Sequence, residues 1–84
     1  MPIYEIVFKK KAQKFLASQE KSQRLRLYKA IFKLPNEGDI KKLQGSDMYR
    51  LRIGPFRVLY IVDHGIKVIN VENIDNRGDI YKKP

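Results

Sequence analysis

Residues 49–62, which read YRLRIGPFRVLYIV, decide the fold that this sequence can adopt. The stretch is rich in β-branched and aromatic residues, and Gly54 and Pro55 interrupt it. A Gly-Pro pair between two such runs is typical of a tight turn. The stretch therefore predicts two antiparallel strands, Tyr49 to Ile53 and Phe56 to Val62, joined by a two-residue turn.

This hairpin is expected to carry three arginines on one face. Side chains alternate between the two faces of a strand, so Arg50 and Arg52 lie opposite the apolar residues of the first run. A two-residue turn then sets Arg52 across from Arg57. We call the surface that carries Arg50, Arg52 and Arg57 the arginine face. Directly opposed like charges destabilise a sheet, whereas the planar guanidinium suits bidentate hydrogen bonding to phosphate. The arrangement predicts a phosphodiester ligand.

A second interpretation is that the arginine face is only solvated. Arginine stems lie along apolar surface while their charged ends reach water, and acids such as Glu72 or Glu5 could contact them. Alternation alone does not decide between the two interpretations.

Toward the N-terminus, the sequence predicts a strand followed by a helical hairpin. Ile3 to Phe8 alternates apolar and polar residues with the period of a strand. Helical spacing begins at Lys9 and fades near Ser18, and a second helix, capped by Ser22 or the Ser18 region, ends before Pro35. This second helix has two adjoining apolar stripes: Leu25, Tyr28 and Phe32, and Leu27, Ile31 and Leu34.

The remaining segments complete the predicted sheet. Ile40 to Gly45 is expected to be an exposed, irregular connector. Asp63-His64-Gly65 predicts a turn into a last strand from Ile66 to about Ile74. The fold class is therefore α+β, with an N-terminal strand, a helical hairpin and a three-stranded antiparallel meander in one small sheet. Residues 1–84 are expected to form a single domain.

Composition narrows the partners of this domain. The 84 residues hold 18 Lys and Arg against nine Asp and Glu, a net charge of +9, which favours nucleic acid or an acidic protein as partner. Nine of the cations fall between Lys9 and Lys33, where they suit diffuse contact with an RNA backbone or simple exposure to solvent. With no Cys and one His, no metal or cofactor is expected. Without a leader or a long apolar run, the sequence predicts a cytoplasmic protein with no membrane contact.

Three segments together resemble the RelE/ParE superfamily of bacterial and archaeal toxins, most closely the RelE-type messenger-RNA interferases. They are Lys42-Leu-Gln-Gly45, the hairpin from Tyr49 to Tyr60, and Ile74-Asp-Asn-Arg-Gly-Asp-Ile-Tyr81. The resemblance covers essentially the whole chain and implies a small α+β sheet with the helical hairpin on one side. It also implies the toxin of a type II toxin–antitoxin system, which cleaves mRNA in the ribosomal A site.

The resemblance assigns catalytic roles to three residues. Arg57 matches the strand arginine that contacts the scissile phosphate, and Arg77 matches a basic residue near the family's C-terminus. Tyr81 matches the terminal tyrosine that orients the nucleotide or assists proton transfer, although it could equally anchor the tail on the sheet. The implied activity is a metal-independent endoribonuclease, in which a ribose 2′-hydroxyl attacks the neighbouring phosphate.

Four further residues are expected to bind RNA: Lys42, Arg50, Arg52 and Asn76. Many relatives carry His where this chain has Asn76, and an amide cannot act as acid or base near neutral pH. His64 is not expected to replace it, because its turn lies at the far end of the strand from Arg57. A strong general base is missing from this set.

The resemblance also implies partners and leaves rivals open. A cognate antitoxin is expected to cover the arginine face, so that the toxin is a monomer when free and a hetero-oligomer with its antitoxin. The ribosome and mRNA are the expected targets. The rivals are a ParE-like toxin that binds DNA gyrase without nuclease activity, and an inactive homologue that binds RNA.

Overall fold

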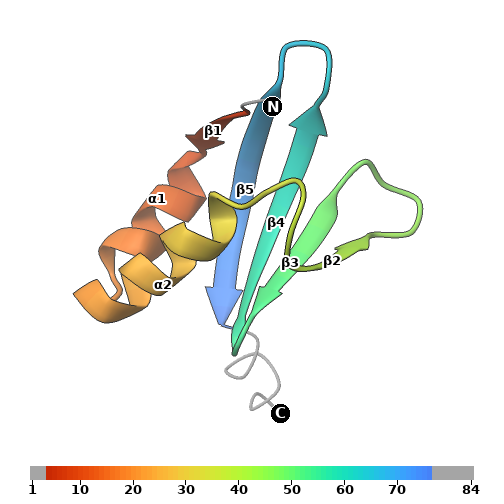
Figure 1. The fold of residues 1–84 in the computed structure, drawn as a ribbon. Helices are drawn as coiled ribbons and strands as arrows, with labels where there is room; N and C mark the ends of the chain where they lie inside the picture. Colours follow the sequence, from red (N-terminus) through yellow and green to blue (C-terminus); the bar gives the residue numbers. More distant parts are fainter. Residues whose placement is uncertain (1–3, 77–84) are drawn as a thin grey trace.

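The computed structural model describes residues 4–76, which form one five-stranded sheet and two helices (Figure 1). The elements in chain order are β1 (Glu5–Phe8), α1 (Lys10–Ala17), α2 (Lys21–Ile31), β2 (Asp39–Lys42), β3 (Tyr49–Ile53), β4 (Phe56–Asp63) and β5 (Val68–Asn76). The strand order is β1-β5-β4-β3-β2, with β1 parallel to β5 and the other neighbours antiparallel. The two helices therefore connect the opposite edges of the sheet.

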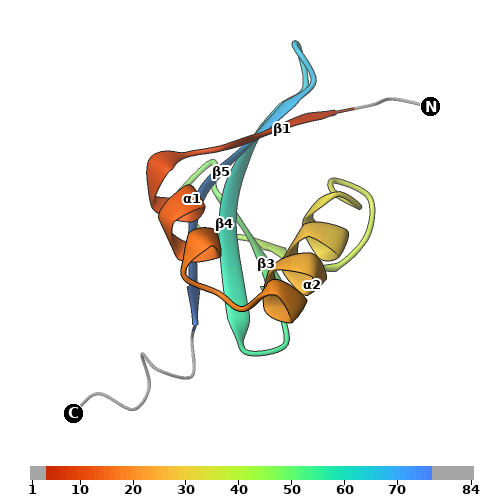
Figure 2. The same ribbon diagram turned by 90° about the vertical axis from the view of Figure 1, so that its left-hand side faces the viewer.

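The helices pack on one face of the sheet and close the hydrophobic core. α1 lies against β5 and α2 against β3, as Figure 2 shows. Ala12 and Leu16 of α1 and Leu27 and Ile31 of α2 are at most 3% exposed. They belong to one cluster with buried residues of the sheet: Leu51, Ile53, Phe56, Val58, Tyr60, Ile69, Val71 and Ile74. The expected α+β architecture, with an N-terminal strand and a helical hairpin, is confirmed.

The β3–β4 hairpin has the register that its sequence predicts. Gly54 has φ +57°, which a glycine adopts readily at the first central position of a two-residue turn. Ile53 pairs with Phe56 across the turn, and Arg52 pairs with Arg57. The alternation that defines the arginine face is therefore preserved on both strands.

The expectation of an irregular connector from Ile40 to Gly45 is wrong for the first part of that segment. Asp39–Lys42 forms β2, which pairs antiparallel with β3 and lies at the far edge of the sheet. Its sequence, DIKK, holds one apolar residue, so no alternation marks it as a strand. The strand forms because its main chain satisfies the free hydrogen-bonding edge of β3. The sheet therefore contains one strand more than predicted.

Neither Ser22 nor Ser18 caps the second helix as predicted. The N-cap of α2 is Glu20, and no side chain hydrogen-bonds to the amides of its first turn. Ser18 instead ends α1, where its hydroxyl donates to the carbonyl oxygen of Phe15 at 2.7 Å. The loop between the helices is thus held from the end of α1.

The two apolar stripes of α2 have different environments. Leu27, Ile31 and Leu34 are buried, whereas Leu25 and Phe32 of the other stripe are 52% and 61% exposed. Within residues 4–76, no helix is long and apolar enough to cross a membrane.

The last strand begins at Val68, two residues later than predicted. The Asp63 carboxylate accepts hydrogen bonds from the amides of Gly65 and Ile66, at 3.0 and 3.2 Å, and so holds residues 65 and 66 in the turn. Lys67, at φ +56°, completes the turn.

Candidate phosphate-binding site

Strands β3 and β4 place three arginines on the face of the sheet away from the core. Arg52 and Arg57 are register partners, and Arg50 lies two residues from Arg52 on the same strand. The side chains of Arg50 and Arg57 are only 16% and 25% exposed, whereas Arg52 is exposed. The predicted arginine face is therefore present, and two of its guanidinium groups are partly withdrawn from water.

A groove of about 830 Å³ adjoins the arginine face, and we call it the β2–β3 groove. Its walls are Lys41 and Lys42 at the end of β2, the loop of residues 43–47, and Arg50 and Arg57. Three of the predicted site residues, Lys42, Arg50 and Arg57, thus meet at one concave surface. A positively charged hollow of this kind concentrates anions, because its walls reduce the screening by water.

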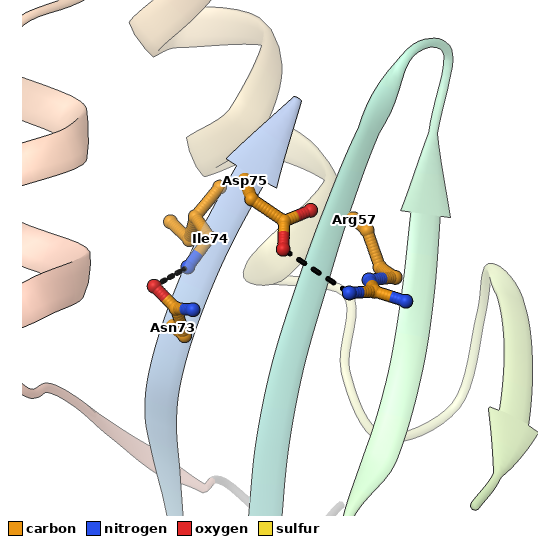
Figure 3. A network of polar contacts seen from close by, with 4 residues as sticks. All are labelled: Arg57, Asn73, Ile74 and Asp75. Carbon is orange, nitrogen blue, oxygen red and sulfur yellow. Dashed lines mark hydrogen bonds and ion pairs between the residues drawn. The ribbon is translucent and has the colours of Figure 1, made fainter. Parts of the chain in front are cut away.

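Each partly buried arginine has a carboxylate partner. Asp39 Oδ1 lies 3.4 Å from Nη2 of Arg50, and Asp75 Oδ2 lies 3.2 Å from Nη2 of Arg57. Figure 3 shows the side chains of Arg57 and Asp75 pointing toward one another from neighbouring strands. Asp39 is 59% exposed, whereas Asp75 is only 24% exposed, so water screens the pair with Arg57 less.

Acids of neighbouring strands partly neutralise the arginine face. Within residues 4–76, the acids that form ion pairs with these arginines are Asp39 and Asp75, not Glu72 or Glu5. Lys41 is the register partner of Arg50 and lies on the same side of the sheet. This surface therefore carries four cations against two carboxylates: Lys41, Arg50, Arg52 and Arg57 against Asp39 and Asp75. The surface keeps a net positive charge after internal pairing.

A β-bulge in β5 turns Asp75 toward Arg57. The pairing of β4 with β5 skips Glu72, which is an extra residue on the β5 side. Val71 before the bulge and Ile74 after it both point into the core, a spacing of three residues where an unbroken strand has two. Without this interruption, the alternation from Val71 would direct Asp75 into the core. Bulges commonly re-aim side chains in this way next to functional sites.

The ion pair of Arg57 and Asp75 leaves hydrogen-bonding groups unused. Asp75 Oδ1 and Arg57 Nε are both shielded from solvent and have no hydrogen-bond partner, and the same holds for Arg50 Nε. The pair is therefore not the two-bond fork that arginine and a carboxylate usually favour. Unpaired groups of this kind cost free energy, so a ligand that supplies partners would be stabilised there.

The other predicted RNA-binding residues have different placements. Lys42 is the register partner of Tyr49, and alternation along β2 directs its side chain to the opposite face from that of Lys41. Both lysines nevertheless line the β2–β3 groove. Asn76 ends β5 as the partner of Phe56, on the helix-facing alternation rather than on the arginine face. Arg77 and Tyr81 lie outside the described residues.

His64 and Tyr60 are accounted for by structural contacts. His64 lies in the β4–β5 turn, at the far end of β4 from Arg57. Its Nδ1 atom is 2.8 Å from the hydroxyl oxygen of Tyr4. Burial, followed by the nearby Tyr49 hydroxyl, raises the pKa of Tyr60 to about 12. Tyr60 therefore stays protonated in the core, stacked on Tyr49 with ring centroids 5.5 Å apart. Among residues 4–76, no cluster of three His, Cys, Asp or Glu side chains could hold a metal ion.

The prediction from sequence missed three residues of this surface: Asp39, Lys41 and Asp75. The first two were missed because β2 has no strand-like alternation. Asp75 was missed because unbroken alternation places it on the core side, where a carboxylate is not expected. The odd spacing of the apolar residues Val71 and Ile74 is the signal that could have located the bulge.

Comparisons with known proteins agree on the family. Residues 6–81 match the family model described as the ParE toxin of the type II toxin-antitoxin system, parDE. A candidate toxin RelE1 from Methanocaldococcus jannaschii is 49% identical to this chain over 47 residues. That match covers 55% of this chain and 52% of the relative, so the chain spans about half the length of the curated relative.

Solved structures of RelE toxins share the whole fold. The archaeal RelE–RelB complex from Pyrococcus horikoshii OT3 matches with a TM-score of 0.74 and 30% identity over 90% of this chain and 97% of the other. The RelB–RelE antitoxin–toxin complex from Methanococcus jannaschii matches with a TM-score of 0.72 and 27% identity over 89% and 94% of the two chains. The chain therefore belongs to the RelE/ParE superfamily, the toxins of type II toxin–antitoxin systems.

Proposed function

We propose that this toxin is a RelE-type endoribonuclease that cuts mRNA on the ribosome and so inhibits translation. The observation that carries the proposal is the meeting of Arg50 and Arg57 with Lys41 and Lys42 at the β2–β3 groove. Arginine and lysine side chains around a hollow next to a sheet face suit a chain of phosphodiesters better than a single small anion.

In the proposed reaction, a ribose 2′-hydroxyl attacks the neighbouring phosphate without the help of a metal. Arg57 stabilises the negative charge that develops on the phosphate oxygens, and Arg77 joins it from the C-terminal segment. Lys42, Arg50 and Arg52 hold flanking phosphates, and Tyr81 contacts the nucleotide. The ribosome supplies the positioning of the mRNA that this small site does not provide by itself.

The N-terminal end of α1 provides a further basic surface for the RNA backbone. Lys9, Lys10 and Lys11 line a second hollow, of about 430 Å³, whose walls also include one acid, Glu72, together with Leu59 and Asn73. Leu59 is two residues from Arg57 along β4 and therefore shares its face. Contacts of this kind contribute affinity that depends on salt and not on sequence.

We propose that a cognate antitoxin controls this cytoplasmic toxin. The similar RelE proteins from Pyrococcus horikoshii and Methanococcus jannaschii were solved in complex with RelB. An acidic segment that covers the arginine face would neutralise part of the +9 charge and compete with RNA. The free toxin would be a monomer and the inhibited form a hetero-oligomer.

A second candidate is a ParE-like toxin that acts on DNA gyrase and cleaves no RNA. The matching family model, that of the parDE toxin, favours it. The positive arginine face would then bind an acidic protein surface. The two candidates differ in whether cellular RNA is cut.

The deciding experiment is induced expression of the toxin while new mRNA 5′ ends and DNA supercoiling are mapped. The wild type is compared with Arg57→Ala and with Lys29→Ala, which removes an equal charge from an exposed position of α2, the helix that packs on the other face of the sheet. We expect new 5′ ends with the wild type and Lys29→Ala, and a loss of about 10²–10³ in cleavage with Arg57→Ala. Growth arrest with intact transcripts and altered supercoiling would favour the gyrase candidate.

A further inference from the structure

We propose that Asp75 accepts the proton of the ribose 2′-hydroxyl and is the residue by which this site distinguishes RNA from DNA. The inference deepens the proposed nuclease function and rests on it. It supplies the acid–base group that was missing from the residues predicted from the sequence.

The position of Asp75 follows from that of Arg57. Its Oδ2 atom lies 3.2 Å from Nη2 of the guanidinium that is proposed to bind the scissile phosphate. In RNA, each 2′-hydroxyl is next to the 3′-phosphate of the same nucleotide. A carboxylate hydrogen-bonded to the phosphate-binding guanidinium is therefore within reach of that hydroxyl once the phosphate is bound.

The unused hydrogen-bonding groups of the pair complement a ribonucleotide. Asp75 Oδ1 has no donor, and Arg57 Nε has no acceptor. A 2′-hydroxyl can donate to the carboxylate, and a phosphate oxygen can accept from the guanidinium. Both atoms are shielded in the free protein, so contact requires the two side chains to turn. The carboxyl torsion of Asp has a broad profile, which makes such a turn inexpensive for Asp75.

Among residues 4–76, Asp47 also lines the β2–β3 groove but forms no ion pair with Arg57, and two other proton acceptors are less well placed. Asp39 belongs to β2, two strands away from Arg57, and contacts Arg50. His64 is bound to Tyr4 at the far end of β4. Among residues 4–76, Asp75 is the acid that forms an ion pair with Arg57.

A role limited to neutralising Arg57 explains less of the geometry. A structural counterion would be most stabilising as a two-bond fork, whereas this pair leaves one carboxylate oxygen and one guanidinium nitrogen unused. The side chains also remain 25% and 24% exposed, so a ligand can approach them from solvent. The bulge at Glu72 further turns an acid toward a face that is otherwise built to bind anions.

The proposed cleavage needs one proton acceptor from the protein, and all protons and bonds are then accounted for. Asp75 takes the proton of the 2′-hydroxyl, the bond from O2′ to phosphorus forms, and the bond from phosphorus to O5′ breaks. The departing O5′ takes one proton from solvent, and Asp75 later returns its own proton to solvent. The products are a 2′,3′-cyclic phosphate and a 5′-hydroxyl end.

Two matched substitutions separate recognition from proton transfer. Asp75→Ala removes both functions, whereas Asp75→Asn keeps an oxygen that can accept a hydrogen bond but cannot take a proton. Asp39→Asn is the control, because it removes a carboxylate from the same face at another arginine. Removing any carboxylate from this face should strengthen binding of RNA and DNA alike, so the ratio of the two affinities is the diagnostic quantity.

The experiment measures binding of one oligonucleotide sequence made as RNA and as DNA, together with cleavage of an mRNA on programmed ribosomes. Circular dichroism melts check that each variant is folded. We expect the wild type and Asp39→Asn to prefer RNA about tenfold, and Asp75→Ala to lose the preference. Asp75→Asn should keep most of the preference and lose about 10²–10⁴ in cleavage rate.

The outcomes distinguish failure of this inference from failure of the proposed function. Cleavage by Asp75→Asn at the wild-type rate would overturn the proton-acceptor role while the nuclease function stands. A wild type that prefers RNA through Asp75 but cuts nothing would overturn the nuclease function and the proton transfer, and would support the recognition role. Equal binding of RNA and DNA by the wild type would overturn the recognition role.

Discussion

The helix-covered face of the sheet and the arginine face differ in how their side chains are held. On the covered face, core residues of the sheet are at most 8% exposed and pack against two helices. On the arginine face, like charges lie side by side, and the guanidinium groups of Arg50 and Arg57 each have one carboxylate contact and an unsatisfied Nε. The first face is built for stability, and the second retains hydrogen-bonding groups that a ligand can satisfy.

The largest expected effect on stability concerns the covered face. Leu27 of α2 is fully buried, so Leu27→Ala should lower the free energy of unfolding by about 2–5 kcal/mol. Leu25→Ala, on the same helix at a position 52% exposed, should change it by no more than about 0.5 kcal/mol. Urea unfolding of both variants checks the pair. Equal losses would show that the exposed stripe of α2 is packed in solution.

A smaller effect is expected from Tyr60 at high pH. Because the pKa of Tyr60 is about 12 in the folded protein and 10.0 in the unfolded chain, the unfolded state loses its proton first as pH rises. The free energy of unfolding should therefore fall between pH 10 and 12, by at most about 2–3 kcal/mol. Tyr60→Phe should remove this part of the pH dependence, as measured by urea unfolding at each pH. A curve unchanged by the substitution would contradict the assignment.

On the arginine face, Arg52 should contribute one phosphate contact. Arg52→Ala should weaken RNA binding and reduce the slope of log affinity against log salt by roughly one unit. The matched variant Lys29→Ala, at an exposed position of α2, should change the slope less, because α2 packs on the other face of the sheet. Fluorescence titrations at several salt concentrations measure both slopes. Equal slopes for the two variants would indicate diffuse binding without a defined face.

The smallest expected effect is the contribution of the Arg57–Asp75 pair to stability. Both side chains are about a quarter exposed, so a double-mutant cycle with Arg57→Ala and Asp75→Ala should give a coupling of about 0.2–1 kcal/mol. A coupling well above this range would mean that the pair is primarily structural. A value within the range, together with large losses of cleavage, would sharpen the contrast between the two faces.

The sequence by itself determined the fold class and the position of the three arginines. Alternation from Tyr49 to Ile53, a Gly-Pro turn and helical spacing are local patterns, and each persists because one face of the element must be buried. The pairing of Arg52 with Arg57 follows from the two-residue turn alone. The family resemblance was also readable from sequence, because its motifs are contiguous.

Only the tertiary structure decided what surrounds those arginines. β2 has no local pattern of its own and becomes a strand by pairing with the edge of β3, which adds Asp39 and Lys41 to the surface. Asp75 reaches Arg57 through a bulge opposite β4, and a bulge depends on how two strands far apart in the sequence are aligned. Contacts between strands depend on register, which one residue can change, and for this reason the arginines were predictable and their partners were not.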